Sequence, residues 1–175
     1  MNRNDRLIYF AIFIVVLAQL VICNYLFLGP LVTLTLLPVA VLFIPLKHKS
    51  AAAMLLAFLM GLFVDWLSDG VLGLNAAALV PVAFARDFLI RLFVGEDTVV
   101  RMDPVTVNKP GWFRMIAMIS VAILLFLLVY VPLDSAGERS LGFNAARIGI
   151  SYAVSLLAGI ALANVFSNLN KREQL

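Results

Sequence analysis

The stretch GLFVDWLSDGVLGLNAAALV, residues 61–80, places two aspartates among glycines, alanines and large apolar side chains. Asp65 and Asp69 lie four residues apart, so on a helix they would share one side, where two carboxylates could bind a cation or act as general acid and base. Their position at the end of an apolar run, followed by Gly70, is more typical of helix capping and close packing. We therefore predict structural roles for both aspartates and no catalytic role.

Other residue types that serve catalysis are sparse. His48 is the only histidine, and it lies in a Lys-His-Lys turn suited to lipid headgroups. Cys23 is the only cysteine, so one chain can form neither a disulfide nor a cysteine metal site. The sequence contains no glycine-rich phosphate loop, no Ser/His/Asp set and no metal-ligand cluster. We predict that the protein is not an enzyme and uses no cofactor or metal.

The composition is that of an integral membrane protein, since 63% of the 175 residues are hydrophobic and only 13% are charged. Nearly all residues fall in apolar runs, which predicts a single membrane domain over residues 1–175. The formal net charge of +3 does not indicate nucleic-acid binding, because the basic residues stand at the ends of apolar runs, where they meet the lipid headgroups.

Transmembrane helices must position these residues, and the sequence predicts an all-α bundle of six of them. The predicted spans cover residues 7–28, 31–46, 50–67, 71–93, 112–132 and 141–169, and the longest loop covers residues 95–111. The first span would reach roughly 33 Å at about 1.5 Å per residue, enough to cross the hydrocarbon core. Pro38 and Pro45 predict a kink in the second span, and Ser68 or Asp69 is expected to cap the fourth.

The distribution of basic residues predicts that both termini are cytoplasmic. With that orientation the cytoplasmic side holds Arg3, Arg6, Lys47, Lys49, Arg101, Lys109, Arg114, Lys171 and Arg172. The opposite loops contain only Arg139, and all of them are short. Little of the chain is therefore expected outside the membrane on that face.

Two charged residues are expected at a similar depth near the outer surface. Counting along the helices places Asp65 roughly 8 Å below that surface and Arg147 about 9 Å below it. An unpaired charge there costs about 2–3 kcal/mol on insertion scales. We predict an ion pair between Asp65 and Arg147; the alternative is that each side chain reaches the outer interface separately.

A second charged group lies in the fourth span. Asp87 and Arg91 are spaced as a helical i,i+4 pair, and both Arg86 and Arg91 are expected to extend to the cytoplasmic headgroups. The alternative is that these residues form a partner surface.

Small residues predict close helix contacts in two places. In the quoted stretch these are Gly61, Gly70, Gly73, Ala76, Ala77 and Ala78. In the last span they form a stripe with a spacing of four residues: Ser151, Ser155, Gly159 and Ala163. The spacing leaves open whether each contact is internal to the bundle or made with another protein.

The order glycine, aspartate, glycine, Leu-Gly and alanines from Gly61 to Ala77 resembles the hallmark of the MreD family of bacterial rod shape-determining membrane proteins. The length, six-span hydropathy and short outward loops agree with this resemblance along the whole chain. It carries over Asp65, Asp69 and Gly73, with Gly61, Gly70 and Asn75 beside them, as packing or partner-facing residues.

The resemblance implies a noncatalytic scaffold of the cell-wall elongation machinery in the bacterial inner membrane. Such a protein would bind the membrane protein MreC and help to maintain rod shape. It would also work with RodA and its class B transpeptidase, and indirectly with the MreB filament. The bundle is further expected to resemble the substrate-binding subunits of energy-coupling vitamin transporters.

A transporter subunit that binds a small vitamin-like molecule is the alternative function. Polar groups near the outer side are few, namely Asn75, Asn144, Asp65 and Arg147, and the outward loops are too short to form a lid. The early small-residue motif used for docking is also missing, since Ala11 and Ala18 stand seven residues apart among bulky side chains. The sequence therefore favours the scaffold.

Overall fold

In this computed structural model, the described residues are 3–25, 29–47, 50–68, 71–101, 105 and 111–171. They form seven α-helices and no strand, which confirms the predicted all-α class. The helices are α1 (Arg3–Tyr25), α2 (Leu37–Leu42), α3 (Ser50–Leu67), α4 (Leu74–Phe93), α5 (Glu96–Val100), α6 (Gly111–Ser135) and α7 (Leu141–Lys171).

Four of these helices are long and apolar enough to cross a membrane. The qualifying segments are Arg6–Tyr25, Ser50–Leu67, Gly111–Ser135 and Leu141–Leu169, in α1, α3, α6 and α7. A chain with several such helices is a multi-pass membrane protein. The helix α4 is also long, but Arg86, Asp87 and Arg91 lie in its second half, and it does not qualify by composition.

The predicted second span is not a continuous helix. Residues 31–36 carry no helical structure, and a helix of only six residues, α2, follows them. The chain enters this segment through Gly29, whose φ of +87° is a left-handed conformation that glycine adopts without strain. Leu36 already has αR angles, and the backbone before it, residues 32–35, stays extended because side chains of neighbouring helices satisfy its hydrogen bonds, as described below.

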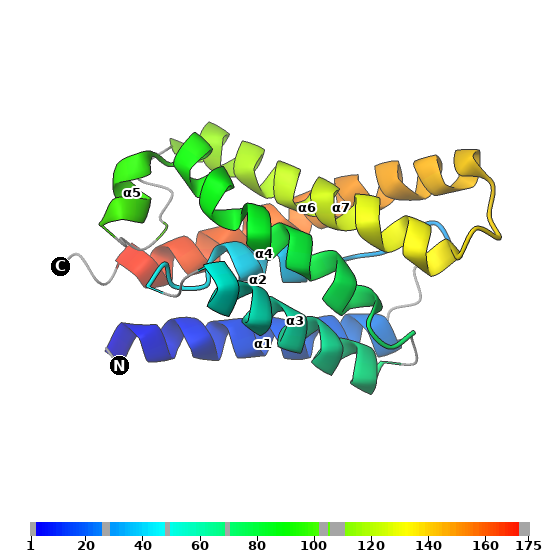
Figure 1. Ribbon diagram of the computed structural model, residues 1–175, viewed down its shortest axis with the longest axis horizontal. Coiled ribbons are helices and arrows are strands. Elements are labelled where there is room, and N and C mark those ends of the chain that lie inside the picture. The colour runs from blue at the N-terminus through cyan, green and yellow to red at the C-terminus, as the bar shows by residue number, and fades with distance from the viewer. Residues whose placement is uncertain are drawn as a thin grey trace.

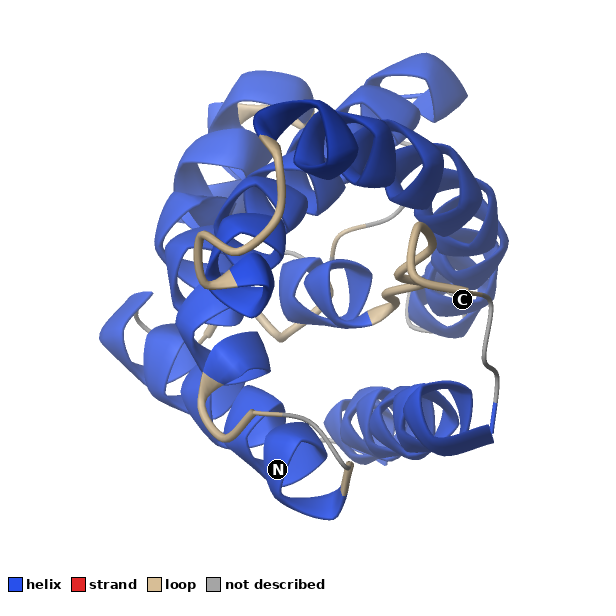
Figure 2. Ribbon diagram, turned by 90° about the vertical axis from the view of Figure 1, so that its right-hand side faces the viewer, coloured by secondary structure: helices blue, strands red, loops and turns tan. Residues whose placement is uncertain are grey.

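The chain runs back and forth along the long axis of the molecule, and α1 begins at the same end at which α7 finishes (Figure 1). The most extensive helix pairing is that of α3 with α4. The short helix α2 lies at the centre, surrounded by the long helices (Figure 2). It contacts α1, α3, α4, α6 and α7, and all six of its residues are buried.

The core is built from apolar side chains around α2. Leu37 and Leu42 from α2 and Phe126 from α6 are completely buried, and the rings of Phe43 and Phe166 stack with their centroids 4.9 Å apart. The outer surface is apolar as well: Phe84 of α4 is 69% exposed. A surface of this kind is suited to lipid contact.

Candidate functional site

Asp65 binds the first turn of the next helix. It lies in the last turn of α3 and is 2% exposed. Its Oδ1 accepts hydrogen bonds from the backbone N–H of Asn75 at 3.1 Å and from the Asn75 side-chain amide at 2.8 Å. Its Oδ2 accepts from the backbone N–H of Ala76 at 3.2 Å. A carboxylate placed here satisfies free N–H groups and also interacts favourably with the helix dipole.

Two glycines make this arrangement possible. A Cβ atom on Gly61, one turn before Asp65, would stand 2.4 Å from the backbone nitrogen of Ala76, so only glycine allows α3 to approach α4 this closely. Gly73 has open space around it but a φ of +90°, which directs the chain into α4. The two glycines therefore have different roles, one in packing and one in backbone conformation.

The expected cap of α4 by Ser68 or Asp69 is not what the described residues form. The helix begins at Leu74, three residues later than predicted, and its N-cap residue Gly73 has no side chain to offer. Asp65 supplies the capping oxygens from the preceding helix instead. Asp69 and Gly70 lie outside the described residues.

Arg147 pairs with Asp134, and the predicted ion pair with Asp65 is wrong. Its Nη1 forms the salt bridge to Asp134, at the end of α6, and its Nε and Nη2 donate to the hydroxyl of Thr33 at 3.2 and 3.0 Å. Both Asp65 oxygens are already engaged by α4. Asp134 is nearer in the fold because a short turn joins α6 to α7 at this end of the molecule (Figure 1).

The small-residue stripe of α7 faces the interior of the bundle. All four members, Ser151, Ser155, Gly159 and Ala163, are buried. The Ser151 hydroxyl accepts from the Thr33 N–H at 2.8 Å, and the Ser155 hydroxyl accepts from the Thr35 N–H at 3.0 Å. A Cβ on Gly159 would stand 3.1 Å from Val39. Of the two alternatives, the stripe packs against the chain itself.

Gln19 is a structural residue that the sequence reasoning missed. This α1 side chain is 2% exposed. Its Oε1 accepts from the Leu36 N–H at 2.8 Å, and its Nε2 donates to the Leu34 carbonyl at 3.0 Å. Gln19 and the α7 serines therefore hold the extended segment from opposite sides. An amide in the middle of a long apolar span was the available signal, because such a group needs a partner inside the protein.

Arg86 is buried rather than extended to the headgroups, which corrects that expectation. It is 0% exposed, its Nη2 donates to the Ile44 carbonyl at 2.7 Å, and its Nη1 lies 3.5 Å from Asp87 Oδ1. The other Asp87 oxygen accepts from the Ser50 hydroxyl at 2.6 Å. Asp87 therefore pairs with Arg86 instead of Arg91. These contacts join the ends of α2 and α3 to α4.

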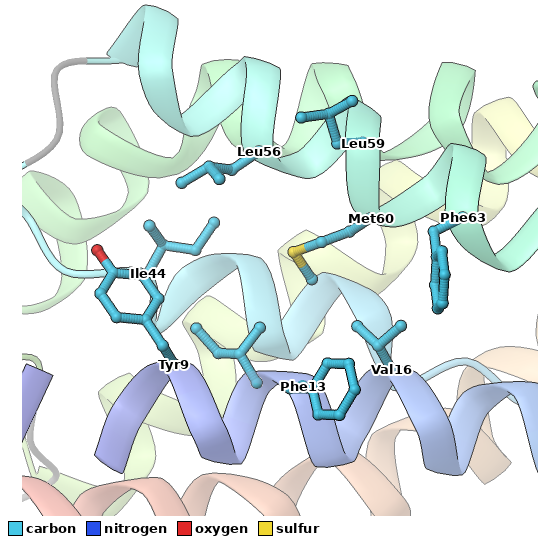
Figure 3. Close-up of a pocket in the computed structure, with 9 residues that line it drawn as sticks. Tyr9, Phe13, Val16, Ile44, Leu56, Leu59, Met60 and Phe63 are labelled. Atoms are coloured by element: carbon cyan, nitrogen blue, oxygen red, sulfur yellow. The ribbon is translucent and has the colours of Figure 1, made fainter. Parts of the chain in front are cut away.

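An apolar cavity of about 290 Å³ lies between α1 and α3. Figure 3 shows side chains from both helices pointing into it, and Tyr9 is the only polar residue among those that line it. Within the described part of the chain, no group of three or more His, Cys, Asp or Glu side chains could hold a metal ion. The cavity therefore has little capacity to recognise a polar ligand.

The fold and these sites define the class of a multi-pass α-helical membrane protein in which several buried polar side chains, such as Asp65 and Gln19, bind its own backbone. Comparisons of the chain with protein-family models, with curated proteins and with solved structures found no match.

Proposed function

We propose that this protein is a noncatalytic scaffold of the bacterial cell-wall elongation machinery, of the MreD kind, that binds an MreC-like membrane protein. The observation that carries the proposal is the corner at which α3 meets α4. There the residues of the MreD-like pattern, Gly61, Asp65 and Asn75, contact backbone and each other. A protein that acts only through its surfaces needs residues that fix how its helices meet. The MreD-like pattern supplies such residues at the junction of α3 and α4.

The proposal includes six passes through the inner membrane with both termini in the cytoplasm. The four long apolar helices would account for four of these passes. The extended segment with α2, and the charged helix α4, would supply the other two. The concentration of Lys and Arg on one side of the predicted topology supports this orientation.

The apolar cavity supports the scaffold over a vitamin-binding subunit. A water-soluble ligand needs several precisely placed polar groups, whereas the cavity between α1 and α3 offers only Tyr9. Arg147, which could have bound an acidic ligand, is engaged by Asp134 and Thr33. The structure thus gives the transporter alternative no specific support.

Copurification tests the proposal. Tagged protein extracted from a rod-shaped bacterium in mild detergent should recover an MreC-like partner, and Gly61→Ala should reduce that recovery. Gly149→Ala is the matched control, because a Cβ at this α7 glycine would meet no atom within 4 Å. Recovery of a stoichiometric vitamin-like molecule without a protein partner would reject the scaffold and support transport.

A further inference from the structure

The apolar cavity between α1 and α3 is a groove that opens on the outer surface of the bundle. Phe13 and Leu59, which line it, are 52% and 50% exposed. Ile12 and Ile44, which also line it, are 7% and 2% exposed and so form its floor. In Figure 3 the two helices face each other across this space, with Met60 directed toward α1. Because the surrounding surface is apolar, this groove is accessible to lipid chains.

One end of the groove is polar, and two exposed basic side chains, Arg6 and Lys47, belong to it. Tyr9 lines that end, and the Lys47 amine lies 5.8 Å from the centroid of its ring. Arg6 precedes Tyr9 by three residues on α1, which places it on the same side of the helix, and both cations are exposed.

The other end of the groove is apolar. Val16 and Phe63 line it. Among the described side chains, α1 and α3 present no exposed charged residue there, because Asp65, the only charged residue of α3, is buried against α4. The described basic side chains, Arg6 and Lys47, thus lie at one end of an apolar groove.

From these features we propose that the groove binds one acyl chain of an anionic phospholipid, with the lipid phosphate beside Arg6 and Lys47. Basic residues at the end of a cleft between transmembrane helices are suited to anionic headgroups. The groove runs from Tyr9 to Val16 on α1, about 10 Å at about 1.5 Å per residue. This fits within one leaflet of a hydrocarbon core of about 30 Å, and it is too short to seat a membrane-spanning partner helix. The proposal does not depend on the scaffold function.

Native mass spectrometry of the full-length protein tests this site. The detergent-purified protein is mixed with equal amounts of phosphatidylglycerol and phosphatidylcholine that carry the same acyl chains. We expect preferential retention of one phosphatidylglycerol. Lys47→Gln and Arg6→Gln should each lower the preference about fivefold, the value of one cation near an anionic lipid. Leu56→Trp, which fills the groove, should remove the tightly bound lipid of either type.

Matched variants on other faces serve as controls. Arg91→Gln removes an exposed cation elsewhere, and Leu128→Trp enlarges an exposed side chain of α6, so both should retain the wild-type preference. Equal retention of the two lipids, or a preference that survives both charge substitutions, would overturn the proposal. So would a copurifying polypeptide or second copy that Leu56→Trp displaces while lipid retention is unchanged. The charge substitutions lie at exposed positions, so the test holds even if Leu56→Trp does not fold.

Discussion

At the scale of single residues, Asp65 shows how a carboxylate can be stable inside an apolar bundle. The first N–H groups of a helix have no partner within that helix. The N–H groups of Asn75 and Ala76 both find one on Asp65, and the N–H of Leu74 reaches the carbonyl of Val71. In the described part of the chain, the partners of the Asp65 carboxylate are thus two backbone N–H groups and the Asn75 amide, and the dipole of α4 adds to their effect.

Removing this carboxylate should destabilise the protein. We expect Asp65→Ala to lower the free energy of unfolding by about 1–3 kcal/mol, because two buried backbone N–H groups lose their acceptors. Asp65→Asn keeps one acceptor oxygen, so its free energy of unfolding should lie between those of the wild type and Asp65→Ala. Detergent-solubilised protein titrated with a denaturing detergent and followed by circular dichroism measures this. Asp97→Ala, at an exposed site in α5, is the control, and an equal loss in that variant would contradict the capping role.

Gly61 offers a second test at this scale. We expect Gly61→Ala to cost about 1–3 kcal/mol, since its Cβ would overlap the backbone of α4 and force the helices apart. Gly149→Ala should instead be neutral or raise stability by up to about 1 kcal/mol, because alanine favours the helix and the site has room. The same unfolding titration compares the two variants. Similar free energies of unfolding for both would show that α3 and α4 can shift to accommodate the added methyl group.

At the scale of elements, the non-helical segment 31–36, extended over residues 32–35, is the least expected part of the fold. Non-helical backbone at membrane depth is tolerated only where protein groups satisfy it. Gln19 from α1 and Ser151 and Ser155 from α7 provide those groups. The segment therefore joins two helices that are far apart in sequence, and α2 follows it into the core.

The strength of this junction can be measured by hydrogen exchange. Gln19→Leu leaves the Leu36 N–H and the Leu34 carbonyl without their partner, at about 1–3 kcal/mol for each buried group. We expect the peptide covering residues 29–36 to exchange its amide hydrogens faster in this variant. Asn24→Leu is the control on the same helix, since Asn24 is exposed and its amide donates to the Leu67 carbonyl, away from residues 29–36. Unchanged exchange in Gln19→Leu would mean that the serines alone hold the segment.

At the scale of the whole molecule, the beginning of α1 and the end of α7 lie together (Figure 1). The charge distribution leads us to propose that this end is cytoplasmic. The turn between α6 and α7, which includes Glu138, would then face the outside.

Cysteine labelling in intact cells checks this orientation. In a Cys23→Ser background, a membrane-impermeant maleimide should label Glu138→Cys directly. Asn168→Cys and Asp97→Cys should react only after the membrane is permeabilised. All three positions are exposed, so a difference in labelling reports sidedness rather than burial. Labelling of Asn168→Cys in intact cells would reverse the proposed orientation.

The candidate sites show which contacts a local sequence pattern can predict and which it cannot. The position of Asp65 at a helix end predicted a structural role, but the cap of α4 was expected from Ser68 or Asp69, which are closer to it in sequence than Asp65. The predicted pairing of Asp65 with Arg147 was wrong, because depth along a helix does not specify which side of the bundle a residue faces. Arg86 was misplaced for the same reason: the length of its side chain permits extension to the headgroups, and only the position of Ile44 shows why it stays inside.

The sequence by itself determined that this is an all-α, multi-pass membrane protein, because apolar character and span length are properties of contiguous residues. It also indicated that Gly61 and the α7 stripe pack closely, since small side chains permit little else. Only the tertiary structure decided that residues 31–36 are not helical, that Gln19 supports them, and that Asp65 binds the backbone of α4. Those outcomes depend on which hydrogen-bonding groups of distant segments come within about 3 Å of each other, and a linear pattern does not contain that distance.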